Sequence, residues 1–184
     1  MSRVLLPLAQ GCEEIEAVTL IDILRRAGIE VITAGLAPGP VCASRGTVLL
    51  PDTTLDLVLS ETFDMIVLPG GMPGSEHLKN DTRVISLLQR LAVAGKFVAA
   101  ICAAPMALHA AGLLEGKRAT SFPGVLDELP GSHHYLDEAV VVAGNIVTSR
   151  GPGTAMDFAL TLVELLAGKR KRDEVEEALQ RPAT

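Results

Sequence analysis

Short apolar runs alternate along the chain with longer stretches in which apolar residues recur every three or four positions. The short runs predict buried strands at 3–8, 29–34, 63–68 and 96–101, a pair of strands or a hairpin at 41–50, and a hairpin at 140–149. The longer stretches predict helices at 13–27, 82–94, 103–111, 153–166 and 173–179. Strands that alternate with helices of this length are typical of βαβ units and a mostly parallel sheet. We therefore expect residues 1–184 to form one domain, a three-layer α/β/α sandwich with a flavodoxin-like core.

The composition narrows the class of protein. Hydrophobic residues make up 48% of the 184 positions and charged residues 21%, which excludes a disordered chain. The net charge of −6 disfavours binding to phosphate backbones, so we expect no sequence-specific nucleic-acid binding. Three cysteines are too few, and odd in number, for a disulfide scaffold. Free thiols favour a reducing compartment, and we expect a cytoplasmic protein.

One stretch approaches the length of a membrane span. Residues 97–114, about 18 positions, carry no formal charge. Cys102, Pro105 and His109 interrupt the stretch, and a buried strand that runs into a buried helix explains it equally well. We therefore expect no membrane segment.

In an open parallel sheet, ligands bind outside the carboxyl ends of the strands. This rule limits the search for chemistry to the segments 9–16, 69–75, 102–105 and 149–154. The chain has no glycine-rich nucleotide loop, and its histidines and cysteines lack metal-ligand spacing, so we expect no cofactor and no metal.

Cys102 is the most informative residue in these segments. It lies between an apolar strand and a helix-forming run, with no Gly, Asn or Asp to make an ordinary turn. The chain must bend at Cys102 itself, which is the geometry of a nucleophile elbow. A thiol at the start of a helix is biased toward the thiolate form. The alternative is a buried, inert cysteine, which is the interpretation we favour for Cys12 and Cys42.

Two further features lie at the same edge of the predicted sheet. The turn at Gly70 and Gly71 allows a backbone N–H to point into the crevice, although a plain tight turn explains it too. Glu13, Glu14 and Glu16 open the first helix, where carboxylates usually complement the helix dipole. Glu16 lies at the edge of the apolar stripe, where half-burial would raise its pKa. Helical spacing alone does not choose between Glu13 and Glu16 as a proton carrier.

Four stretches together resemble a known family. They are GCEEIE at 11–16, VLPGG at 67–71, AICAAP at 100–105 and TSRGPGT at 148–154. In this order they resemble the ThiJ/PfpI superfamily, and within it the branch of the parkinsonism-associated protein deglycase and its bacterial YajL-type relatives. The resemblance extends to about residue 168.

The resemblance implies roles for individual residues. Cys102 would be the reactive thiol, and Glu16 the protonated carboxyl beside it. The backbone N–H groups of Gly71 and Ala103 would form an oxyanion site. Arg45 would line the pocket, together with Pro152 and Gly153 from a loop of the partner subunit in a homodimer.

The resemblance also implies an activity. We expect a cofactor-free deglycase or glyoxalase that acts on free 2-oxoaldehydes and on proteins or nucleotides modified by methylglyoxal or glyoxal. The alternative is a redox-responsive chaperone or thiol sensor in which oxidation of Cys102 is the signal. A third hypothesis is a binding or structural dimer without chemistry.

The chain departs from the family pattern at one position. Phe122 precedes Pro123 where human-type members carry a His. Without that His, a general base near the thiol is missing, and Glu16 is left as the proton carrier. A PfpI-type protease, which would need such a His, is disfavoured.

Overall fold

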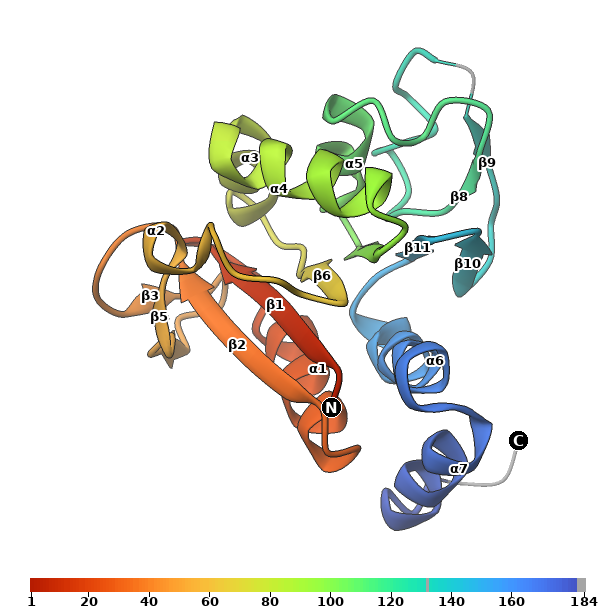
Figure 1. Cartoon of the computed structure of the whole chain (residues 1–184). Coiled ribbons are helices and arrows are strands. Elements are labelled where there is room, and N and C mark those ends of the chain that lie inside the picture. Colours follow the sequence, from red (N-terminus) through yellow and green to blue (C-terminus); the bar gives the residue numbers. More distant parts are fainter. Residues whose placement is uncertain (132, 182–184) are drawn as a thin grey trace.

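A seven-stranded sheet forms the centre of the molecule (Figure 1). The computed structural model describes residues 1–131 and 133–181. The strand order is β10-β11-β7-β6-β1-β2-β5, and all neighbours pair in parallel except β10 and β11. The strands are β1 (Arg3–Leu8), β2 (Glu30–Gly35), β5 (Thr53–Thr54), β6 (Met65–Leu68), β7 (Phe97–Ile101), β10 (Val140–Ala143) and β11 (Ile146–Ser149). Two short ladders lie outside this sheet, β3 (Val41–Cys42) with β4 (Val48–Leu49) and β8 (Arg118–Ala119) with β9 (His134–Tyr135).

Helices cover both faces of the sheet, which confirms the predicted three-layer sandwich (Figure 1). One face packs against α1 (Glu14–Arg26) and α6 (Ala155–Ala167), with α7 (Lys169–Ala178) beyond them. The other face packs against α2 (Leu55–Val58), α3 (Gly74–Asn80), α4 (Thr82–Val93) and α5 (Pro105–Ala110). Strand β1 shows why two cores form. Its residues Val4 and Leu6 enter one core and Leu5 the other, because side chains alternate across a strand.

Most predicted elements are present, with ends shifted by a few residues. Asp81 caps α4, because its side chain accepts a hydrogen bond from the N–H of Arg83 at 2.9 Å. The strand predicted at 63–68 begins at Met65, and Phe63 instead packs under the guanidinium of Arg3, 5.1 Å from the ring centroid. The helix predicted at 153–166 begins at Ala155, after a single 3-10 turn at Pro152–Thr154.

Helix α3 was not predicted from the sequence. Its first residues follow Pro73, and the pattern there indicated only a turn. The helix forms because it packs on α5 and buries Leu78 in the core. Tertiary packing therefore overrides a weak local preference at this point.

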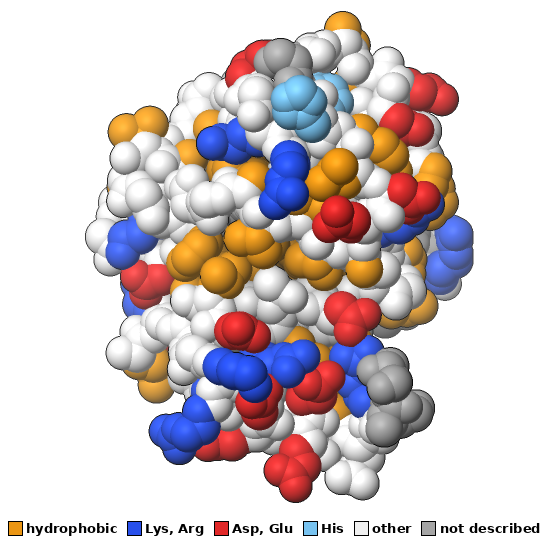
Figure 2. Space-filling view, turned by 90° about the vertical axis from the view of Figure 1, so that its right-hand side faces the viewer, with side chains coloured by type: hydrophobic (Ala, Val, Ile, Leu, Met, Phe, Trp, Pro, Cys, Tyr) orange, Lys and Arg blue, Asp and Glu red, His pale blue; other side chains and the backbone are white. Residues whose placement is uncertain are grey.

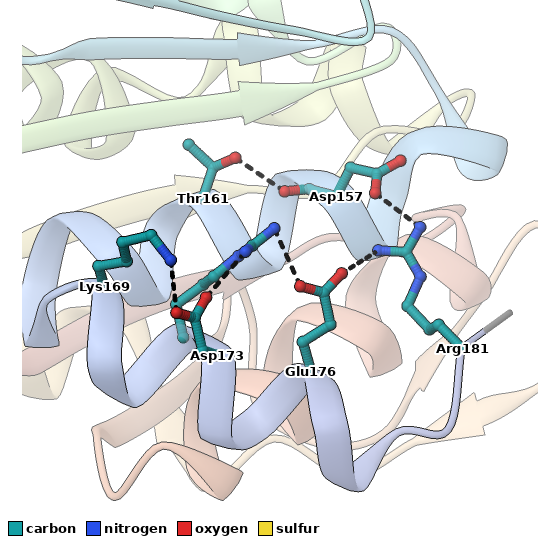
Figure 3. Close-up of polar contacts among 7 residues, drawn as sticks. Asp157, Thr161, Lys169, Asp173, Glu176 and Arg181 are labelled. Atoms are coloured by element: carbon teal, nitrogen blue, oxygen red, sulfur yellow. Dashed lines mark hydrogen bonds and ion pairs between the residues drawn. The ribbon is translucent and has the colours of Figure 1, made fainter. Parts of the chain in front are cut away.

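Helix α7 begins at Lys169, four residues before the predicted start at Asp173. The basic run joins the helix because its side chains pair with acids about one turn later, as Arg172 does with Glu176 at 3.0 Å (Figure 3). Arg181 then connects Glu176 to Asp157 of α6, at 3.3 and 2.7 Å. Charged side chains crowd the lower part of the face in Figure 2, where α7 lies, so this helix presents a charged surface to solvent.

The uncharged stretch at 97–114 contains strand β7 and helix α5, as expected. Within the described part of the chain, no helix has both the length and the apolar character needed to span a bilayer.

The loops that follow β1 and β6 touch each other at the carboxyl edge of the sheet. The N–H of Glu13 donates to the carbonyl of Gly70 at 2.9 Å. A Cβ placed on Gly71, where φ is +90°, would lie 2.4 Å from the backbone nitrogen of Glu13. Gly71 is therefore required both by its left-handed backbone and by the close approach of a second backbone. This contact closes the crevice in which β1, β6 and β7 end.

We expect Gly71→Ala to destabilise the fold by about 3–5 kcal/mol, because it adds a steric overlap with backbone to the left-handed strain. Gly95→Ala is the matched control, since Gly95 has φ of +69° and a Cβ added there would meet nothing within 4 Å. It should cost about 1 kcal/mol from strain alone. Urea unfolding followed by circular dichroism measures both, and equal losses would contradict the close-approach argument.

Candidate active site

Cys102 lies at a sharp bend between β7 and α5. Its φ is +63°, and Gln180 is the only other non-glycine residue in the described ranges with a positive φ. The bend is held on both sides, since the N–H of Cys102 donates to the carbonyl of Ser149 at 3.0 Å and its carbonyl accepts from the N–H of Phe122 at 2.8 Å. A left-handed cysteine costs about 1–2 kcal/mol, which these contacts offset. The elbow predicted from the sequence is confirmed as a backbone feature.

Glu16 reaches the same point from the first turn of α1. The expectation of half-burial was wrong, because Glu16 is completely buried. Its Oε2 accepts a hydrogen bond from the N–H of Gly70 at 2.7 Å, and the Cys102 side chain is close enough to the carboxyl to lower its pKa. Glu13, the alternative, uses its carboxylate to cap α1 by accepting from the N–H of Glu16 at 2.9 Å. The loop after β6 covers Glu16 and leaves Glu13 at the rim of a cavity.

Burial governs the electrostatics of this pair. Burial raises the pKa of Glu16 to about 7, although the hydrogen bond from Gly70 opposes the shift. Burial, and then the charge of an ionised Glu16, raise the pKa of Cys102 to about 12. Protonation of Glu16 removes that charge and makes the carboxyl a donor. The two groups therefore titrate as one coupled unit.

Two backbone amides oppose the desolvation of the sulfur. The N–H groups of Gly71 and Ala103 are close enough to the Cys102 side chain to lower its pKa. Helix α5 itself starts only at Pro105, so these two amides, rather than a long helix dipole, are the local groups that favour a thiolate. They are the donors that the resemblance implied for an oxyanion site. When a substrate carbon is bonded to the sulfur, the same two N–H groups lie close to the oxygen on that carbon.

The sulfur opens into a cavity of about 770 Å³. Arg45 and Pro152, both expected pocket residues, line it, and Arg45 is positioned by its backbone N–H, which donates to the carboxylate of Glu14 at 2.9 Å. Pro152 reaches the cavity from its own chain, so this contact needs no partner subunit. Gly153 is exposed and is not among the described residues that line the cavity.

Several lining residues were not found from the sequence. The wall opposite Arg45 comes from α5 and from the segment after β8, neither of which carries a motif of its own. Phe122 was noted only as a departure from the family pattern. The remaining members of this group became visible only when the chain folded; they are Met72, Lys79, Met106, His109, Ala110, Gly124, Val125, Glu128 and Leu129.

The other thiols lie outside this arrangement. Cys12 is completely buried, and burial raises its pKa to about 11, whereas Cys42 is exposed on β3. Across residues 1–131 and 133–181, no three His, Cys, Asp or Glu side chains gather as a metal site would require.

Known proteins resemble this chain over nearly its full length. Drosophila melanogaster Protein dj-1beta is 47% identical over 174 residues, which cover 94% of this chain and 93% of the relative. The crystal structure of Drosophila DJ-1beta superposes with a TM-score of 0.95 at 45% identity, and covers both chains completely. A Caenorhabditis elegans relative named glutathione-independent glyoxalase DJR-1.2 is 39% identical, over 94% of this chain and 91% of its own.

The comparison with protein families agrees with these relatives. The model of the DJ-1/PfpI family matches residues 2–165, which include all the segments that build the site. The match and the similarity over nearly the full length together decide the assignment: this chain belongs to the DJ-1/PfpI family.

Proposed function

We propose that the chain is a cofactor-free glyoxalase and deglycase in which Cys102 is the nucleophile. The observation that carries the proposal is the meeting of the Cys102 sulfur, the buried Glu16 carboxyl and two backbone amides at one cavity. The name of the C. elegans relative supports the same class of reaction. The substrates would be 2-oxoaldehydes such as methylglyoxal, and their early adducts with proteins or nucleotides.

The first step forms a carbon–sulfur bond. Glu16 takes the proton of the Cys102 thiol as the sulfur attacks the aldehyde carbon of the 2-oxoaldehyde, and the carbonyl electrons move to the oxygen. The amides of Gly71 and Ala103 stabilise the oxyanion, and Glu16 supplies the proton that gives a hemithioacetal. With an aminocarbinol adduct, the carbon–nitrogen bond breaks instead, and the amine leaves with the proton from Glu16.

The second step is an internal redox exchange. Glu16, now a carboxylate, removes the proton from the sulfur-bearing carbon and returns it to the neighbouring carbonyl carbon, while the hydroxyl proton passes from the first oxygen to the former ketone oxygen through an enediol. The former aldehyde carbon is oxidised to a thioester while the ketone is reduced to an alcohol, so no external oxidant is needed. Water then cleaves the thioester, releases a 2-hydroxy acid such as lactate, and regenerates the thiol. A carboxyl with a pKa of about 7 suits both directions of proton transfer.

We also propose that the chain forms a homodimer. Large apolar side chains are exposed on α1 and on the hairpin beside it, with Leu50 at 80% exposed, Val48 at 65% and Ile15 at 56%. Glu14 ties the two elements together through a hydrogen bond to Ser44 at 3.0 Å. An exposed apolar patch of this kind on a soluble domain is typical of an interface.

Cys102→Ser should lower kcat/KM for methylglyoxal by at least about 100-fold, because a serine hydroxyl is a much weaker acid and nucleophile than a thiol, and Glu16 cannot take its proton as readily. Lactate production measures the rate. Cys42→Ser, which removes an exposed thiol from β3, is the control and should keep the wild-type rate. A Cys102→Ser variant at the wild-type rate would exclude the mechanism. A single lactate released per thiol would favour the sensor hypothesis over an enzyme.

The pH profile of Cys102 alkylation tests the coupling to Glu16. In the wild type, we expect the rate of Cys102 alkylation to show an inflection near pH 7. Raising the pH through the pKa of Glu16 removes the proton that Cys102 and Glu16 share. The profile of Glu16→Gln should lack this inflection and show only the inflection of the Cys102 thiol. Glu13→Gln, which removes a carboxylate from the cavity rim, should retain the inflection of the wild type. Identical profiles for the wild type and Glu16→Gln would show that the two groups do not interact.

Sedimentation equilibrium tests the assembly. The wild type should sediment as a dimer, and the double variant Val48→Lys with Leu50→Lys should shift toward monomer because two charges would be buried at the interface. Val93→Lys, at an exposed position at the end of α4, is the control and should remain dimeric. A wild-type chain that stays monomeric at high concentration would refute the interface.

A further inference from the structure

Two large, half-exposed apolar side chains line the cavity into which the reactive sulfur opens. Met72 is 50% exposed and Phe122 is 49% exposed, and both line the cavity above Cys102. Each of these two residues belongs to a segment whose backbone lies next to Cys102. Met72 follows Gly71, whose amide lowers the pKa of the thiol, and the N–H of Phe122 donates to the Cys102 carbonyl at 2.8 Å. A molecule that reaches the sulfur through this cavity therefore shares the cavity with both side chains.

The apolar surface continues behind Phe122. Met106 and Ala110 of α5, with Val125 and Leu129 of the following loop, line the same cavity. Together with Met72 and Phe122, these hydrophobic side chains make up the apolar wall of the cavity.

The loop that carries part of this wall is held in place. Leu126 is fully buried, and its carbonyl is hydrogen-bonded to the ring of His133 at 2.8 Å. The ring of His109 contacts the carbonyl of Pro130 at 2.7 Å, and the two histidine rings meet edge to face. The wall is therefore formed before a ligand arrives, which lowers the entropic cost of binding against it.

The charged side chains that line the cavity favour neither anionic nor cationic ligands. Arg45 and Lys79 are balanced by Glu13 and Glu128. A cavity of about 770 Å³ is also large for methylglyoxal, because pockets of roughly 300–1,000 Å³ hold drug-sized molecules. The methyl group of methylglyoxal would leave most of the apolar wall in contact with water.

We propose that Phe122, together with Met72, is a specificity-determining residue that favours 2-oxoaldehydes bearing an aromatic or bulky apolar substituent. This inference rests on the proposed glyoxalase function and names the substrate class of the same site. The substituent packs on the wall while the aldehyde carbon reaches the sulfur. For phenylglyoxal the overall reaction adds one water and gives mandelate and a proton, and the ring takes no part in the chemistry.

The test compares two substrates in matched variants. Initial rates with phenylglyoxal and methylglyoxal give the ratio of kcat/KM values, and comparison of this ratio between variants cancels the intrinsic reactivity of each aldehyde. Phe122→Ser should lower the ratio by about tenfold, mainly through KM for phenylglyoxal, because the ring loses its apolar partner. Phe122→Leu should keep the ratio within about threefold, since it remains apolar.

Two controls make the test decisive. Val142→Ser removes another half-exposed apolar side chain, on β10 and away from the cavity, and should leave the ratio unchanged. Intact mass after each assay excludes modification of arginines by phenylglyoxal, and circular dichroism confirms that each variant is folded. A Phe122→Ser ratio within twofold of the wild type would overturn the inference while Cys102-dependent turnover persists. Activity on both substrates that survives Cys102→Ser would instead overturn the proposed function.

Discussion

The site depends on one left-handed residue. Strand β7 ends at Ile101, and the backbone of Cys102 turns with φ of +63° before α5 begins. This conformation is unfavourable for any residue with a Cβ, and it persists because β11 and the segment at Phe122 hold its amide and carbonyl. The bend places the sulfur within hydrogen-bonding reach of Glu16 and of two backbone amides. A relaxed turn at Cys102 would separate these groups.

The same arrangement shows how a parallel sheet makes chemistry from distant segments. Glu16 follows β1, Gly71 follows β6 and Cys102 follows β7, and these three strands are neighbours in the sheet. The chain continues to one side of β1 through β2 and to the other side through β6, so the crevice lies at a topological switch point. The glycines of the β6 loop let two backbones approach, and that approach buries the Glu16 carboxyl. Burial then raises the pKa of Glu16 to about 7.

The nature of the cavity follows from what surrounds this polar centre. Cys102, Gly71 and Ala103 line the cavity together with apolar side chains from α5 and from the segment after β8. Phe122 belongs to both parts, since its backbone supports the elbow and its ring faces the cavity. Replacing the side chain of Phe122 therefore changes the surface that a substrate contacts, but it keeps the backbone hydrogen bond to the Cys102 carbonyl.

The sequence by itself determined the layers, most elements and the residue at the centre of the site. Alternation between short apolar runs and amphipathic stretches is a local property, and a cysteine between a strand and a helix without any turn former leaves the backbone only one place to bend. The family motifs pointed to Glu16 and to the amides of Gly71 and Ala103. Local pattern failed at α3, whose stability comes from packing on α5, and at the start of α7, where ion pairs extend the helix.

Only the tertiary structure decided the environment of these groups. Helical spacing did not distinguish Glu13 from Glu16 as the proton carrier. The loop at Gly70, more than fifty residues away along the chain, covers the carboxyl of Glu16, whereas Glu13 lines the cavity. The apolar wall also joins residues from separate elements that share no pattern along the chain. Burial and electrostatic coupling depend on long-range contacts, so they appear only when the strands are placed side by side.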